Sequence, residues 1–203
     1  MSLNYAKNKF ILLLLIITTS CINCSCSNIK NRDTQKQGVF EKLYTSNYKS
    51  DTDLATSFII LAHLALSVEQ MELMRLDYEK ETDDKIKFLY EFVFAKRMFD
   101  YKYRVAFIDR ANKYPELLVK TDSDWISVTS PLLNFLCFCM NDDDKAVETA
   151  IKMFQLDLLD GVYATTVSYD LFDQYKIDPR RITSIANKLG IDKKSLDIML
   201  EIP

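Results

Sequence analysis

The stretch Trp125-Ile-Ser-Val-Thr-Ser-Pro-Leu-Leu-Asn-Phe-Leu-Cys-Phe-Cys-Met140 decides the fold. Beyond Pro131 it is apolar almost without interruption, which is typical of a helix that is buried on most sides. Proline cannot donate the backbone hydrogen bond of a helix interior, so we expect a kink or a fresh helix start at Pro131. A helix with so little polar surface needs other elements to cover it.

The flanking segments also predict helices, because their apolar residues recur at three- and four-residue steps. We expect one unbroken helix from about 54 to 76, a second from about 85 to 114, and shorter ones at about 145–159, 162–175, 179–189 and 193–200. Only three glycines and four prolines occur, which disfavours a β-sandwich and a phosphate-binding α/β fold. The sequence therefore predicts an all-α fold of about seven helices, either an irregular multi-helix bundle or a short α-solenoid of antiparallel helix pairs.

The stretch from Lys7 to Cys21 has the three parts of a secretory signal peptide: two lysines, eight apolar residues and small residues before a cysteine. Eight apolar residues span only ~12 Å as a helix, too short for a hydrocarbon core of ~30 Å. With a cysteine directly after the small residues, the segment resembles a bacterial lipoprotein signal. The resemblance implies that Cys21 receives diacylglycerol and becomes the new N-terminus. Thr18 and Ser20 also suit an ordinary signal peptidase that cuts before the same cysteine.

Domain organisation follows from this segment. We predict a signal peptide over 1–20, a flexible polar tether over 21–37 and a single all-α domain over 38–203. The expected location is the bacterial cell envelope, with the protein anchored to the membrane on the periplasmic or outer side by its lipid. The alternative is a secreted protein, bacterial or eukaryotic. The net charge of −3 makes nucleic acid an unexpected partner.

Four cysteines besides Cys21 need an interpretation. Cys137 and Cys139 lie in the apolar run, so we interpret both as small buried side chains. A disulfide from this helix to Cys24 or Cys26 is an alternative, because an exported compartment permits it. A zinc site is disfavoured, since the two Cys-x-Cys pairs lack the usual two-residue spacing.

The sequence indicates no catalytic residue, metal site or cofactor. Its one histidine, His63, lies among apolar residues and is interpreted as a core-edge side chain that is hydrogen-bonded to a neighbour. No zinc-protease, nucleophile-elbow or glycine-rich phosphate motif occurs. Asp142-Asp143-Asp144 predicts a helix cap rather than a calcium loop, because Val147 and Met153 stand where such a loop needs Gly and Glu. A carboxylate pair acting as acid and base is not excluded.

The segment from Phe94 to Lys113 carries six basic and two acidic residues, interleaved with tyrosines. Within one helix, Arg97, Tyr101 and Arg104 are expected to share a stripe, and such side chains often anchor protein interfaces. The sequence therefore favours a non-enzymatic protein-binding module, such as an immunity-type protein or an assembly factor, with an unidentified protein partner. The alternative is a hydrolase that acts on envelope polymers with a carboxylate pair.

Overall fold

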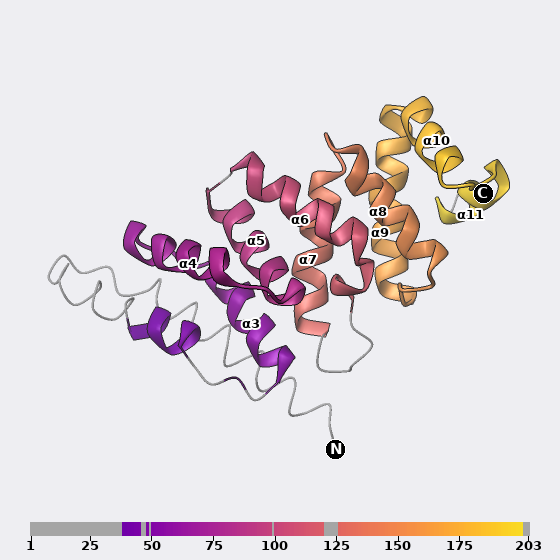
Figure 1. Cartoon of the computed structure of the whole chain (residues 1–203). Helices are drawn as coiled ribbons and strands as arrows, with labels where there is room; N and C mark the ends of the chain where they lie inside the picture. The colour runs from indigo at the N-terminus through magenta and orange to yellow at the C-terminus, as the bar shows by residue number, and fades with distance from the viewer. Residues whose placement is uncertain (1–37, 46–47, 49, 99, 120–125, 201–203) are drawn as a thin grey trace, which may run out of the picture. The chain divides into compact units, whose positions relative to one another are not determined.

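The computed structural model describes residues 38–45, 48, 50–98, 100–119 and 126–200, and the fold in these ranges is all-α, without a strand. This confirms the predicted fold class. From residue 51 onward, the described part contains ten helices, where about seven were expected for the domain; nine are α-helical and one is 3₁₀ (Figure 1). Residues 38–44 are also helical. The helices are α3 (Asp51–Leu61), α4 (Val68–Lys80), α5 (Asp84–Met98), α6 (Tyr101–Lys113), η1 (Pro115–Leu117), α7 (Ile126–Cys139), α8 (Asp144–Gln155), α9 (Gly161–Ile177), α10 (Pro179–Lys188) and α11 (Lys193–Met199).

Backbone contacts group Phe40–Pro203 into one compact unit. The predicted signal peptide and tether lie outside the described residues. No helix in the described ranges combines the length and apolar character needed to cross a membrane.

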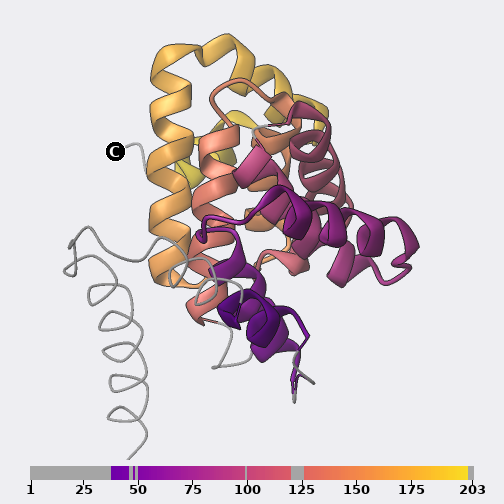
Figure 2. The ribbon, with the colours of Figure 1, turned by 90° about the vertical axis from the view of Figure 1, so that its left-hand side faces the viewer.

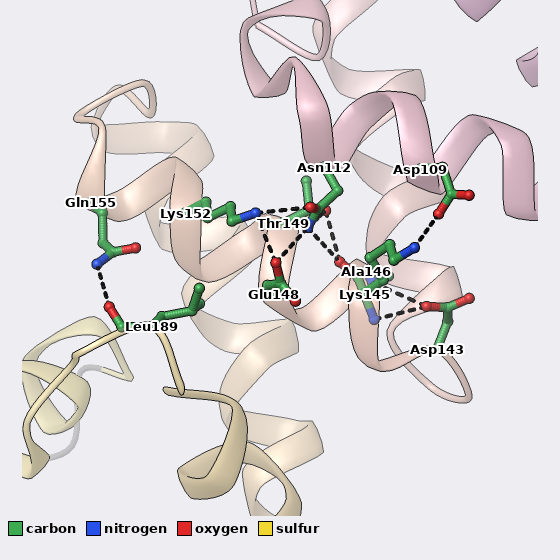
Figure 3. Close-up of polar contacts among 10 residues, drawn as sticks. All are labelled: Asp109, Asn112, Asp143, Lys145, Ala146, Glu148, Thr149, Lys152, Gln155 and Leu189. Atoms are coloured by element: carbon green, nitrogen blue, oxygen red, sulfur yellow. Dashed lines mark hydrogen bonds and ion pairs between the residues drawn. The ribbon is translucent and has the colours of Figure 1, made fainter. Parts of the chain in front are cut away.

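Helices α6 and α8 lie side by side and run in the same direction. Lys145 Nζ at the start of α8 contacts Asp109 Oδ1 at 2.5 Å, and Asn112, one turn further along α6, donates to Thr149 Oγ1 at 3.1 Å (Figure 3). Residue numbers therefore rise together along both helices, as they do in a parallel pair.

Helix α10 continues this row beside α8. Arg181 Nε donates to Asp144 Oδ1 at 2.6 Å near the starts of both helices. Near their ends, Gln155 Nε2 donates to the Leu189 carbonyl oxygen at 3.2 Å (Figure 3). The row α6–α8–α10 is thus parallel throughout, and all three helices begin at the same edge of the unit.

Helices α5, α7 and α9 run against this row. Arg110, in the last turn of α6, pairs with Glu91 and with Asp84 near the start of α5, so the two helices are antiparallel. The turns from α7 to α8 and from α9 to α10 are short, and each of these two pairs packs together. Helix α7 lies beside α9, as Figure 2 shows, and also contacts α3. The three consecutive pairs are stacked, with their turns at one edge.

Aromatic side chains fill the core between these helices. The ring of Phe88 on α5 stacks on Phe107 of α6 with centroids 4.7 Å apart, and Phe92 meets Phe135 of α7 edge-on at 5.5 Å. Burying a phenylalanine side chain stabilises a fold by about 1.5–3 kcal/mol. The predicted burial of the run after Pro131 is confirmed, because Leu132, Leu133 and most of its other apolar residues are buried.

The predicted unbroken helix from 54 to 76 is wrong, because α3 ends at Leu61 and α4 begins at Val68. The physical reason is a capping box. The Ser67 hydroxyl accepts from the Gln70 backbone N–H, and the Gln70 side chain accepts from the Ser67 backbone N–H. These bonds satisfy free backbone donors and start a new helix at this point.

The second long helix, expected from about 85 to 114, also divides in two. Asp100 has an extended backbone, and its carboxylate accepts from the Lys102 backbone N–H at 2.9 Å, which makes it the N-cap of α6. By contrast, Pro131 begins no new helix and lies inside α7. Gly161 is the first residue of α9 and directly follows the N-cap Asp160.

Candidate functional site

The three residues predicted to form a partner-binding stripe do not share one helix. Arg97 lies in the last turn of α5, whereas Tyr101 and Arg104 belong to α6. Because the chain changes direction at Asp100, the predicted stripe of Arg97, Tyr101 and Arg104 is wrong as a continuous surface of one helix.

Within that set, Tyr101 and Arg104 have different roles. Tyr101 is 68% exposed at the first position of α6. The Arg104 side chain is only 18% exposed and forms an ion pair with Asp142, just before α8. Its guanidinium carbon lies 5.8 Å from the centre of the Tyr101 ring. Arg104 therefore joins α6 to the turn before α8 and lies near the Tyr101 ring, which is itself largely exposed.

The three carboxylates of the acidic triplet that precedes α8 all have partners within the fold. Asp143 accepts from two backbone N–H groups of the first turn, which confirms the predicted helix cap. Asp142 pairs with Arg104 of α6, and Asp144 pairs with Arg181 of α10. The triplet thus fastens the row α6–α8–α10 at its starting edge. Among the described residues, no group of three or more His, Cys, Asp and Glu side chains is placed to hold a metal ion.

A large apolar side chain is exposed at each of the three stacked turns. Tyr101 stands at the turn from α5 to α6, Phe138 at the turn from α7 to α8, and Ile177 at the turn from α9 to α10. Their exposed fractions are 68%, 60% and 75%, respectively. We call these three side chains the turn edge. Tyr101 is the first residue of α6, whereas Phe138 and Ile177 lie in the last turns of α7 and α9. Because α6, α8 and α10 begin at the same edge of the unit, all three side chains lie near that edge.

Lys96, in the last turn of α5, is hydrogen-bonded to His63. His63 Nδ1 lies 2.7 Å from the Ile59 carbonyl oxygen, so it carries the proton and leaves Nε2 to accept from Lys96 Nζ at 3.0 Å. The predicted hydrogen bond of His63 is present, although the side chain is exposed rather than at the core edge. Burial lowers the pKa of Lys96, whose ammonium also lies 5.6 Å from the centre of the Phe92 ring.

Aromatic contacts connect this cation to the turn edge. Phe92 packs edge-on against Phe135, and Phe135 stacks on Phe138 with centroids 6.2 Å apart. The exposed ring of Phe138 therefore rests on the aromatic core, which restricts its motion. A rigid exposed aromatic loses little conformational entropy when it is covered, which suits an interface anchor.

Cys137 and Cys139 are free thiols within α7. Cys137 is 7% exposed and Cys139 is completely buried. Burial raises the pKa of Cys137 above its usual range and that of Cys139 to about 12, so both are protonated at neutral pH. Cys24 and Cys26, the partners of the alternative disulfide, lie outside the described residues, as does Cys21.

A hollow of about 460 Å³ brings two carboxylates together and bears on the hydrolase alternative. The Tyr44 hydroxyl donates to Asp77 Oδ2 at 2.6 Å and lies 2.8 Å from the Tyr90 hydroxyl. Glu81 Oε1 accepts from the backbone N–H groups of the two residues that follow it. Both carboxylates are thus already hydrogen-bonded within the fold. The hollow is lined by Tyr44, Thr45, Asp77, Lys80, Glu81 and Tyr90.

Sequence reasoning found Tyr101 but missed Phe138 and Ile177. Phe138 lies in the most apolar stretch of the chain, and nothing in that pattern distinguishes its exposed position from its buried neighbours. Ile177 directly precedes the Asp178-Pro179 helix start, and an apolar residue at such a turn is the one sequence feature that could have indicated it. No protein-family model, curated protein or solved structure matches this chain.

Proposed function

We propose that the protein is an exported, lipid-anchored envelope protein that binds a protein partner through the turn edge and is not an enzyme. The observation that carries the binding proposal is the repetition of an exposed apolar side chain, Tyr101, Phe138 and Ile177, at three successive stacked turns. Single exposed apolar residues are common on protein surfaces. Exposed apolar side chains at three turns along one edge provide several anchors for one partner.

The polar surroundings of the turn edge support the same proposal. Hot spots combine large aromatic side chains with cations, and polar groups usually surround them. At the turn edge, Tyr101 lies over the guanidinium of Arg104, which the ion pair with Asp142 holds in place. An anchor that is already ordered before the partner arrives contributes more of its contact energy to affinity.

The proposed location rests on the segment from Lys7 to Cys21. Export would place the domain outside the cytoplasm, and lipid on Cys21 would hold it at a membrane. The predicted tether of 21–37 would let the domain move away from the surface by roughly 3.3 Å per extended residue. An immunity-type protein and an assembly factor would both use such an arrangement.

The carboxylate-pair hydrolase is the weaker candidate. Asp77 and Glu81 are acceptors in hydrogen bonds that hold the fold, whereas a general acid must carry a proton that it can transfer to substrate. Burial, and then the bond to Asp77, raise the pKa of Tyr44 well above its usual value, so its hydroxyl stays protonated and continues to donate. The hollow therefore serves better as a structural contact between 40–45 and α4.

The binding proposal is tested by partner capture. Full-length wild type and the double variant Tyr101→Ala, Phe138→Ala would be incubated with envelope extracts from cells that produce the protein. Truncation of two hot-spot side chains should weaken capture of the partner at least about 30-fold, which corresponds to about 2 kcal/mol.

Tyr169→Ala is the matched control, because Tyr169 is also an exposed aromatic, 60% accessible, but lies in the middle of α9. Circular dichroism would show that all variants are folded. Equal capture by the wild type and the double variant would refute the turn edge as the binding surface. Loss of capture with Tyr169→Ala alone would place the surface elsewhere on α9.

A further inference from the structure

His63, just after α3, and Lys96, in the last turn of α5, form a hydrogen-bonded pair with a third group behind it. Lys96 Nζ lies 3.0 Å from His63 Nε2, and His63 Nδ1 lies 2.7 Å from the Ile59 carbonyl oxygen. An amine, a base and a group that orients the base therefore follow one another at hydrogen-bonding distances. This is the arrangement that activates nucleophiles for covalent chemistry.

The end of α3 fixes the orientation of the imidazole. The His63 backbone N–H donates to the Ile60 carbonyl oxygen, three residues back, at 2.9 Å. It thereby leaves the Ile59 carbonyl oxygen, four residues back, to accept from the side chain. Because a carbonyl oxygen can only accept, Nδ1 carries the proton and Nε2 presents its lone pair to Lys96. The Ile59 carbonyl would still accept from Nδ1 after Nε2 had taken up a proton, so the ring can serve as a base without losing its place.

Lys96 differs from the lysines that the fold uses in ion pairs. Lys85 and Lys145 pair with Asp51 and Asp109, and these hydrogen bonds raise the pKa of both lysines. Lys96 is half-buried and donates to an uncharged imidazole, and burial lowers its pKa. At a given pH, a larger share of this amine is therefore in the neutral, nucleophilic form.

The surroundings of the pair favour one kind of electrophile. The Lys96 ammonium lies 5.6 Å from the centre of the completely buried Phe92 ring, whereas His63 is exposed, so reagents can reach the pair from solvent. An amine forms an imine with an aldehyde and an amide with an activated acyl group. Water hydrolyses an imine unless the site excludes it, whereas an amide persists at an open site. An open amine such as Lys96 is therefore suited to acylation.

From this geometry, we propose that Lys96 is a covalent acylation site that accepts an activated acyl group from an acyl phosphate or a thioester, with His63 as the base. His63 Nε2 takes one proton from the Lys96 ammonium, and the freed amine attacks the acyl carbonyl carbon. A C–N bond forms, and the bond from that carbon to the phosphate oxygen or thiol sulfur breaks.

The leaving group departs with the bonding electron pair and receives the proton that His63 holds, while the new amide nitrogen loses its second proton to water. The product is an uncharged amide, so Lys96 loses its positive charge. This inference goes beyond partner binding, and it requires one modification per molecule rather than turnover.

The test measures acylation lysine by lysine. Full-length wild type would be incubated at neutral pH with acetyl phosphate in one arm and with an acetyl thioester in the other, and peptide mass spectrometry would give the rate at each lysine. The reference is Lys188, which is exposed in the last turn of α10. We expect Lys96, although less exposed, to react at least about fivefold faster than Lys188 with at least one donor. A smaller difference with both donors overturns the proposal.

Two variants test the role of His63. In His63→Gln the amide oxygen can still accept from Lys96 Nζ but cannot take up a proton, so acylation of Lys96 should fall at least about tenfold while the rate at Lys188 is unchanged. Arg97→Gln is the matched control, because it removes a cation from the same turn of α5, and it should leave the rate at Lys96 within about twofold.

A wild-type rate at Lys96 in His63→Gln would show that His63 is not the base and would overturn the proposal. An equal fall in Arg97→Gln would assign the activation to the local positive charge and would overturn it as well. Circular dichroism would confirm that both variants are folded. The comparison of Lys96 with Lys188 in the wild type decides the proposal even where a variant does not fold.

Discussion

Substitution of Arg110 should destabilise the domain more than substitution of any exposed cation. Glu91 on α5 is completely buried, and its carboxylate accepts two hydrogen bonds of 2.9 Å from the Arg110 guanidinium. The Tyr78 hydroxyl donates a third, of 3.1 Å. Arg110→Met keeps most of the aliphatic volume and removes the charge, which leaves the Glu91 carboxylate buried without a counter-charge.

The expected loss follows from that geometry. Removal of one partner of a buried ion pair costs about 3–5 kcal/mol. Arg110 also pairs with Asp84, which is 49% exposed, and an exposed pair adds only about 0.2–1 kcal/mol. Since domains are stable by about 5–15 kcal/mol, Arg110→Met should remove a large share of the total.

Urea unfolding followed by circular dichroism measures this loss, and two further variants test its cause. Glu91→Gln in the Arg110→Met background removes the unpaired charge, so it should recover at least about half of the stability. Lys145→Met breaks the pair with Asp109, in which both side chains are 50% exposed, and should cost less than about 1 kcal/mol. A deficit below about 1 kcal/mol for Arg110→Met at pH 7, or one that Glu91→Gln does not reduce, would refute this reasoning.

Three other predictions concern processing, thiols and alkaline stability. Wild type should incorporate radioactive fatty acid in producing cells and Cys21→Ser should not; equal labelling would disprove lipidation at Cys21, and a shortened but unlabelled wild type would indicate simple secretion. Cys137 and Cys139 should resist a thiol reagent until urea unfolds the domain, because both are buried and their pKa values are raised; a melting temperature that falls with reductant would indicate a disulfide instead. Burial raises the pKa values of Tyr78 and Tyr90 to about 12, so their contribution is intact below pH ~10 and lost as pH rises to about 12; the urea midpoint should fall over that range, and less so for Tyr90→Phe.

The sequence predicted the fold class because the evidence for helices is local. Asp178-Pro179 marked the start of α10, and the acidic triplet before Lys145 marked the start of α8. The sequence did not indicate the helix break before α4 or the one before α6. Each break depends on a single N-cap residue, Ser67 or Asp100, inside a segment where apolar residues continue at helical spacing. An apolar period indicates helix but cannot show whether one helix or two carry it.

The candidate site was predictable only in part, because its decisive contacts join distant segments. The sequence neighbours of Arg104 suggested an unpaired side chain, but its partner Asp142 lies 38 residues away, in the turn before α8. Phe138 was expected to be buried with the rest of its apolar stretch. Only the packing of α7 against its neighbours determines which side of that helix is covered, and the sequence does not show this. The turn edge exists only once three helix pairs are stacked, so no local pattern contains it.

The most direct test of the account is photo-crosslinking in cells that produce the protein. A photoreactive phenylalanine analogue would replace Phe138, Ile177 or the control residue Tyr169 in the full-length chain. The account predicts that one protein partner is crosslinked from positions 138 and 177 and is not crosslinked from position 169. Crosslinks from position 169 alone, or none from either turn-edge position, would contradict the claim that this protein binds its partner through the turn edge.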